Sequence, residues 1–128
     1  MNYLLDTHVL LWAAGQPELL PVEARTILEN PQNKLYFSSA SIWEISIKNS
    51  LGRADFRVNT SLLRRSLLDN HYEELAIFST HALLIESLPL IHKDPFDRML
   101  IAQSMGEGFT LLTSDTVVAS YFNTIKKV

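Results

Sequence analysis

Four acidic residues stand where the chain is expected to pass from one element of secondary structure to the next. Asp6 directly follows an apolar run, Asp115 lies three residues beyond another, and Glu44 and Asp97 stand near the starts of two expected helices. Carboxylates brought within ~5 Å of one another repel by roughly 3 kcal/mol per pair at an effective dielectric constant of 20. Such a group therefore opposes folding unless it is protonated or bridged by a cation, and oxygen ligands suit Mg²⁺ or Mn²⁺. A metal ion held in this way can activate water and bind the phosphate of an in-line displacement, which is the chemistry of a nuclease.

Each of these acids also has an ordinary structural interpretation. Asp6 and Asp115 can cap helices, and the S-x-x-E spacing of Ser41 and Glu44 fits a capping box. Asp97 can satisfy free N–H groups and the positive end of a helix dipole. For any single acid the capping interpretation is favoured, but the occurrence of all four favours a shared site.

The stretch from Asp94 to Gln103 is the most distinctive part of the sequence. Asp94 is a suitable N-cap, Pro95 suits the first helical position, and Asp97 follows three residues after the cap. The residues that follow are apolar on several faces, which is typical of a helix in the interior of a domain. This pattern predicts a buried helix whose first turn carries carboxylates.

The order of the expected elements places these acids at one edge of a sheet. Apolar runs without alternation indicate strands buried on both faces, and their alternation with helical segments predicts a parallel sheet covered on both sides. The strands are expected at 3–5, 35–37, 75–77 and 110–112, with a last edge strand at 123–126. The helices are expected at 8–14, 22–30, 42–51, 61–70, 79–88, 94–106 and 117–122. We therefore predict one α/β domain over residues 1–128, a three-layer α/β/α sandwich around a mostly parallel sheet of four to five strands.

In such a sheet the carboxyl ends of the strands and the N-termini of the following helices share one edge, where ligands bind. Connectivity alone places Asp6, Glu44 and Asp115 at this edge. Asp97 is placed there less directly, because no strand is evident immediately before its helix.

The composition sets limits on the class of protein. A hydrophobic fraction of 47% and a charged fraction of 20% are ordinary for a globular domain, and no apolar run approaches the ~18 residues of a membrane span. The chain has no cysteine, so a metal would have to be held by oxygen or imidazole. The first residues lack the basic opening of a signal peptide, and a cytoplasmic protein without membrane association is expected.

Four motifs together resemble the PIN-domain family, and are most similar to the VapC-type toxins of type II toxin–antitoxin systems. They are Leu4-Leu5-Asp6-Thr7-His8, Trp43-Glu44, Asp94-Pro95-Phe96-Asp97-Arg98-Met99-Leu100-Ile101-Ala102 and Leu112-Thr113-Ser114-Asp115, and the resemblance covers essentially the whole chain. It implies a metal-dependent ribonuclease that uses Mg²⁺ or Mn²⁺ and cuts single-stranded or looped RNA. It also implies a homodimer that is inhibited by a cognate antitoxin. By their match to the motifs, the acidic-site residues are Asp6, Glu44, Asp97 and Asp115, with Thr7, Thr113 and Asp94 in supporting roles.

The distribution of charge suggests where such a protein would hold RNA. The net charge of −3 is unlike that of a typical nucleic-acid binder, but residues 48–65 carry a local charge of +4, which leaves −7 on the rest of the chain. Lys48, Arg53 and Arg98 are the candidate RNA contacts. Lys48 can instead pair with Glu44 in the i, i+4 orientation, and Arg98 can form a salt bridge beside Asp97. The four histidines show no spacing typical of metal ligands.

A signalling module of the receiver type is the alternative from another class. Its parallel sheet also gathers acids at the strand ends, binds Mg²⁺ and accepts a phosphoryl group. It would carry two adjacent acids after the first strand and a lysine near the last, whereas Asp6 stands alone and Leu111-Leu112-Thr113 contains no lysine. A PIN fold that serves only as an antitoxin-binding scaffold is a further alternative, which the complete set of acids argues against.

Overall fold

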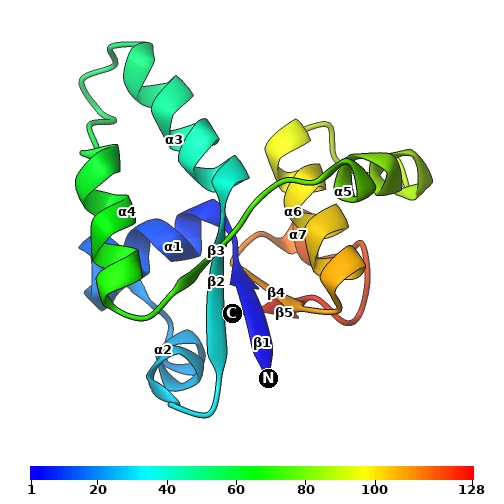
Figure 1. Ribbon diagram of the computed structural model, residues 1–128, viewed down its shortest axis with the longest axis horizontal. Helices are drawn as coiled ribbons and strands as arrows, with labels where there is room; N and C mark the ends of the chain where they lie inside the picture. The colour runs from blue at the N-terminus through cyan, green and yellow to red at the C-terminus, as the bar shows by residue number, and fades with distance from the viewer.

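The apolar runs near residues 4 and 111 form the centre of a five-stranded parallel sheet (Figure 1). The structure is a computed structural model that describes residues 1–128. The strands are β1 (Asn2–Leu5), β2 (Lys34–Ser38), β3 (Glu73–Leu75), β4 (Thr110–Thr113) and β5 (Lys126–Lys127), in the order β3-β2-β1-β4-β5. All four pairings are parallel. The carboxyl ends of the strands therefore lie along one edge of the sheet.

Helices cover both faces of this sheet. They are α1 (Thr7–Gly15), α2 (Val22–Glu29), α3 (Ser39–Ser50), α4 (Thr60–Asp69), α5 (Ser79–Leu84), α6 (Pro95–Glu107) and α7 (Thr116–Ala119), with short 3₁₀ turns at Pro17–Leu19 and Ile85–Ser87. In Figure 1, α1, α2 and α4 lie on one side of the sheet and α5, α6 and α7 on the other. The predicted three-layer α/β/α architecture is confirmed. No helix combines the length and the apolar character needed to cross a membrane.

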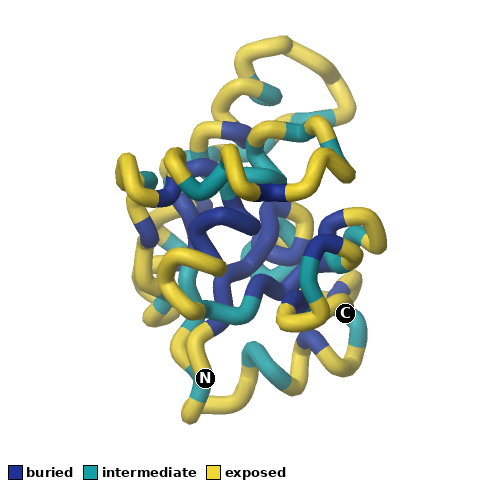
Figure 2. Tube along the Cα trace, turned by 90° about the vertical axis from the view of Figure 1, so that its right-hand side faces the viewer, coloured by how far each residue is buried: buried dark blue, intermediate teal, exposed yellow.

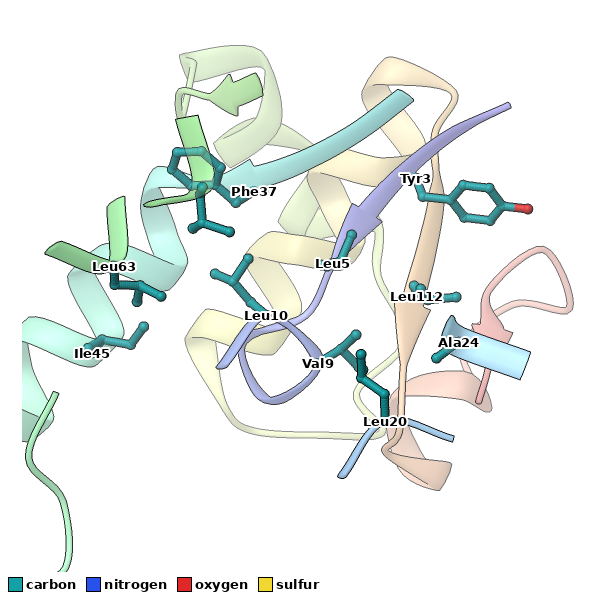
Figure 3. Close-up of a cluster of buried hydrophobic side chains, with 11 residues drawn as sticks. Tyr3, Leu5, Val9, Leu10, Leu20, Ala24, Phe37, Ile45, Leu63 and Leu112 are labelled. Carbon is teal, nitrogen blue, oxygen red and sulfur yellow. The ribbon is translucent and has the colours of Figure 1, made fainter. Parts of the chain in front are cut away.

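The sheet separates two hydrophobic cores. Alternate residues of β1 point to opposite faces, so Tyr3 and Leu5 pack with α1, α2 and α4, whereas Leu4 packs with α6 and α7. Figure 3 shows the first core, where Leu5 and Leu112 of neighbouring strands meet Val9 of α1. Figure 2 shows the buried segments gathered at the centre, with an exposed shell around them. Burial on both faces explains why the central strands show no alternation in the sequence.

The strand β3 and the helix α5 differ in their bounds from the sequence prediction. β3 spans Glu73–Leu75, not 75–77, and only Leu75 of its residues is buried, as befits a short edge strand. The chain leaves the sheet after Leu75, and the carbonyl of Ala76 accepts a hydrogen bond from the buried Gln103 side chain instead (3.3 Å). The helix predicted at 79–88 ends at Leu84 and continues as a 3₁₀ turn.

The other changes are shifts of element ends. α3 starts at Ser39, three residues earlier than predicted, because the Ser38 hydroxyl accepts a hydrogen bond from the backbone N–H of Ala40 (2.9 Å). α3 ends at Ser50, one residue earlier than predicted, and Gly52 behind it adopts the left-handed conformation (φ 69°) that favours glycine. α7 ends at Ala119 instead of 122, and the last strand lies at 126–127 instead of 123–126.

Candidate active site

Asp6 lies at the carboxyl end of β1 and is buried. Its Oδ1 accepts a hydrogen bond from the backbone N–H of Val9 (3.0 Å) and so caps α1. Its Oδ2 accepts a hydrogen bond from the hydroxyl of Thr113, at the end of the neighbouring strand β4. Burial raises the pKa of Asp6 above its usual value, and the nearby Asp115 carboxylate raises it further. The capping interpretation of Asp6 is therefore correct, and the same carboxylate also belongs to a group of acids.

Asp115 shows the same double use. It caps α7, because its Oδ1 accepts hydrogen bonds from the backbone N–H groups of Val117 (2.7 Å) and Val118 (3.3 Å). Its own N–H donates to the Thr113 hydroxyl (3.0 Å), which connects it to Asp6. The Oδ2 of Asp115 receives no hydrogen bond from the protein and is free to bind a ligand.

Glu44 lies on the inner side of α3, and its side chain is only 8% exposed. Its Oε1 accepts a hydrogen bond from the Thr7 hydroxyl (2.7 Å), and its Oε2 pairs with Lys48 (2.9 Å). The capping box considered for Ser41 and Glu44 is wrong, because Ser38 is the N-cap and Glu44 lies in the second turn of α3. Glu44 is thus a buried carboxylate without a capping function, and the residue that follows Asp6, Thr7, donates a hydrogen bond to it.

Asp97 lies in the first turn of α6, which Asp94 caps by accepting hydrogen bonds from Phe96 N (2.8 Å) and Asp97 N (3.1 Å). The start of α6 meets α3 through an edge-to-face contact of Phe96 with Trp43 (ring centroids 5.0 Å apart). Burial raises the pKa of Asp97 to about 6, with further contributions from the Asp94 and Glu44 carboxylates. The structure therefore brings Asp97 to the same edge of the sheet as Glu44.

No three of the four predicted acids bring their ligand atoms within 4.8 Å of one another. Among all acids and histidines of the chain, the one set of three whose ligand atoms lie within 4.8 Å of one another is His92, Asp94 and Asp97. The sequence prediction missed His92, because its spacing matches no metal-binding pattern. The wider group of Asp6, Glu44, Asp97 and Asp115 offers only hard oxygen donors, and two of these carboxyls have raised pKa values. This donor set fits a cation such as Mg²⁺ or Mn²⁺, which keeps several waters between itself and its ligands.

The candidate RNA contacts lie in three different settings. Lys48 pairs with Glu44 and is partly exposed. Arg53 lies beyond the far end of α3, in the exposed loop that stands out in Figure 2, and forms a two-bond pair with Asp55 (3.2 and 3.0 Å). The Arg98 guanidinium donates to the carbonyls of Pro89 and Ile85 and to the hydroxyl of Tyr121. These bonds give Arg98 a structural role, and the structure does not favour it as an RNA contact.

Residues 3–121 match the sequence family described as the PIN domain. The chain belongs to the PIN domain family. No curated protein matches it. The fold also resembles that of VapBC2 from Rickettsia felis, solved with a DNA fragment from its promoter, with a TM-score of 0.73 and 17% identity over 99% of this chain and 98% of that one.

Two further structures share this PIN-like fold. VapBC-1 from nontypeable Haemophilus influenzae superimposes with a TM-score of 0.63 and 17% identity, over 100% of this chain and 97% of that one. A domain of a functionally unknown protein from Methanocaldococcus jannaschii superimposes with a TM-score of 0.60 and 14% identity, over 99% and 89% of the two chains.

The strand order excludes the receiver-type alternative. A receiver-like sheet has the order 2-1-3-4-5, whereas this PIN domain has β3-β2-β1-β4-β5. The first strand here is central and is flanked by β2 and β4, which is why Asp6 lies beside Thr113 and Asp115.

Proposed function

We propose that this PIN domain is a metal-dependent endoribonuclease and the toxin of a toxin–antitoxin pair. The observation that supports the proposal is the pairwise proximity of the predicted acids: the Asp115 carboxylate raises the pKa of Asp6, and the Glu44 carboxylate raises that of Asp97. Two of these carboxyls have raised pKa values because they are buried beside other carboxylates, and a divalent cation would relieve that repulsion.

The residues around the acids hold them in place. The hydroxyl of Thr113 donates to Asp6, and the hydroxyl of Thr7 donates to Glu44. Asp94 caps the helix that carries Asp97. We propose that Asp6, Asp97 and Asp115 contribute oxygen ligands to Mg²⁺ or Mn²⁺, and that Glu44 acts as a further ligand or orients a water. When bound, the ion supplies Lewis-acid activation of water and neutralises charge on the phosphate.

The acidic edge repels RNA phosphate, so binding requires cations beside it. Lys48 pairs with Glu44, and Arg53 follows in the exposed loop after α3. We propose that these two side chains contact the phosphate backbone of single-stranded RNA. Arg98 is left out, because its guanidinium donates to backbone carbonyls of the protein.

The proposed partners follow from the structural neighbours. Two of them are VapBC proteins, which supports a cognate antitoxin for this chain. We also propose that the protein forms a homodimer and is located in the cytoplasm. A short reading frame next to this one, encoding a DNA-binding protein that co-purifies with the chain and blocks its activity, would support the pairing; a chain that no neighbouring product inhibits would contradict it.

Cleavage of single-stranded RNA in the presence of Mn²⁺ tests the proposed activity directly. We expect Asp6→Asn and Asp97→Asn to lose at least about 100-fold in rate, whereas Asp69→Asn, an exposed acid at the end of α4, should leave the rate unchanged. Calorimetry should show Mn²⁺ binding to the wild type and weaker binding to Asp97→Asn. Absence of binding at millimolar Mn²⁺ would refute the metal-dependent mechanism.

A further inference from the structure

The loop between Ser87 and α6 is held by hydrogen bonds more than by packing. Leu90 is 94% exposed and Ile91 49% exposed, and only Leu88 of this loop is buried. Such a segment would be free to move if nothing else restrained it. Its restraint comes from two polar side chains on other elements.

The Tyr121 hydroxyl joins this loop to the C-terminal part of the chain. It accepts a hydrogen bond from the backbone N–H of His92 (2.7 Å) and donates to the carbonyl of the same residue (3.2 Å). Arg98 donates to the Tyr121 oxygen (3.2 Å) and to the carbonyl of Pro89 (2.8 Å). Both backbone groups of His92 are thus fixed by one buried hydroxyl, which lies just after α7.

This restraint aims the His92 imidazole at Asp97. Its Nε2 lies 2.8 Å from Oδ2 of Asp97, and the two side chains are 29% and 21% exposed. An ionised carboxylate only accepts hydrogen bonds, so Nε2 carries the proton in this pair. The other oxygen of Asp97, Oδ1, receives no hydrogen bond from the protein.

Asp97 needs such a restraint because its neighbours repel it. Asp94 and Glu44 both lie near enough to act on its charge. Without the hydrogen bond from His92, the Asp97 carboxylate would favour orientations that turn away from these acids and toward water. The bond from His92 opposes that rotation in the absence of a cation.

We infer that His92 is a positioning residue for Asp97: it holds Oδ2 so that Oδ1 faces the other acids, and the Tyr121 hydroxyl holds His92 in place. The inference rests on the proposed function, in which Asp97 contributes a metal ligand. In this inference His92 acts through Asp97, since its Nε2 is engaged as a donor to that carboxylate. Partners that orient a ligand in this way typically change metal affinity 10- to 100-fold when they are removed.

Mn²⁺ affinity, measured by calorimetry on folded variants, tests the inference. We expect His92→Leu to weaken binding about 10-fold or more, and His92→Gln to stay within about threefold of wild type because its amide N–H can replace Nε2–H. Tyr121→Phe removes only the hydroxyl and should weaken binding in the same direction. Tyr3→Phe is the matched control, because the Tyr3 hydroxyl contacts only the sulfur of Met1.

The outcomes separate the inference from the proposed function. Equal affinity of the wild type and His92→Leu, with binding still lost in Asp97→Asn, would overturn the role of His92 alone. Binding as weak in His92→Gln as in His92→Leu would also overturn it, because it would mean that the ring itself binds the metal. A wild-type protein that binds no Mn²⁺ would overturn the proposed function, and the inference with it.

Discussion

Two aspartates of this site, Asp6 and Asp115, each cap a helix and also belong to the group of acids. Asp6 and Asp115 each use one carboxylate oxygen to cap a helix, and Asp115 keeps the other oxygen free of protein donors. A cap fixes the side chain in one orientation relative to the backbone, which is also what a metal ligand requires. The two interpretations that compete in the sequence are therefore compatible for Asp6 and Asp115, whereas Glu44 and Asp97 cap no helix.

Glu44→Gln tests an acid that caps no helix and whose two oxygens are bound by Thr7 and Lys48. Gln keeps the shape of Glu and can still accept the hydrogen bond from Thr7, so we expect the melting temperature to change little. We expect RNA cleavage to fall by at least about 100-fold, because Gln can neither bind a cation strongly nor accept a proton. Glu29→Gln, on the exposed side of α2, is the control. Wild-type cleavage by Glu44→Gln would give Glu44 a purely structural role.

Asp97 makes the metal-free protein less stable at high pH. Its pKa is about 6 in the folded protein and near 3.8 when unfolded, so the folded state binds the Asp97 proton more tightly. The stabilisation from this proton is complete below about pH 3.8 and is lost as pH rises through about 6. Two pKa units correspond to about 3 kcal/mol, and partial exposure reduces this to roughly 1–2 kcal/mol. We expect Asp97→Asn to be more stable than wild type by that amount at pH 8 and equal to it near pH 3.5. Urea unfolding without metal measures the difference, and a gap that does not vary with pH would contradict it.

At the scale of elements, the sequence predicts what is set locally. The apolar runs of β1 and β4 and the Asp94-Pro95 start of α6 carry their own signals, and their positions are confirmed to within a residue or two. β3 was misplaced because Glu73 and Glu74 are polar, and the strand exists through its pairing with β2. His92 was missed because its approach to Asp97 depends on Tyr121, which lies 29 residues further along the chain. Neighbours fixed by tertiary contacts leave no periodic pattern in the sequence.

Gln103 connects α6 with β2 and with the segment that follows β3. Its Oε1 accepts a hydrogen bond from the Ser38 hydroxyl (2.6 Å) and its Nε2 donates to the carbonyl of Ala76, and it is fully buried. We expect Gln103→Leu to destabilise the protein by roughly 2–3 kcal/mol, because both partners would lose their hydrogen bonds away from water. Denaturant unfolding checks this, with the exposed Gln32→Leu as control. A loss in the free energy of unfolding smaller than that of the control would show that water takes over the hydrogen bonds of the Gln103 side chain.

At the scale of the whole molecule, an acidic protein is proposed to hold a polyanion. The cationic residues 48–65 begin beside Glu44 in α3 and continue through the exposed α3–α4 loop to α4 (Figure 1). The exposed pair of Arg53 with Asp55 contributes little to stability, so Arg53 can exchange this partner for phosphate.

Arg53→Ala is the cleaner test of the RNA path, since Lys48 also pairs with Glu44. We expect weaker binding to single-stranded RNA of every sequence, and a slope of log affinity against log salt reduced by about 0.7. Lys34→Ala is the control, because Lys34 is the first residue of β2 and so lies at the amino ends of the strands, away from the acids at their carboxyl ends. Unchanged affinity and slope in Arg53→Ala would mean that RNA approaches from another side.

The pairing of β1 with β4 also has a consequence for how the protein is made. Leu5 pairs with Leu112, so Asp6 gains its Thr113 neighbour only after 107 further residues have been synthesised. A growing chain that has folded its first strands and helices therefore still lacks Asp115. If the chain is a ribonuclease, its site stays incomplete until β4 and the residues after it have been added and have paired with β1.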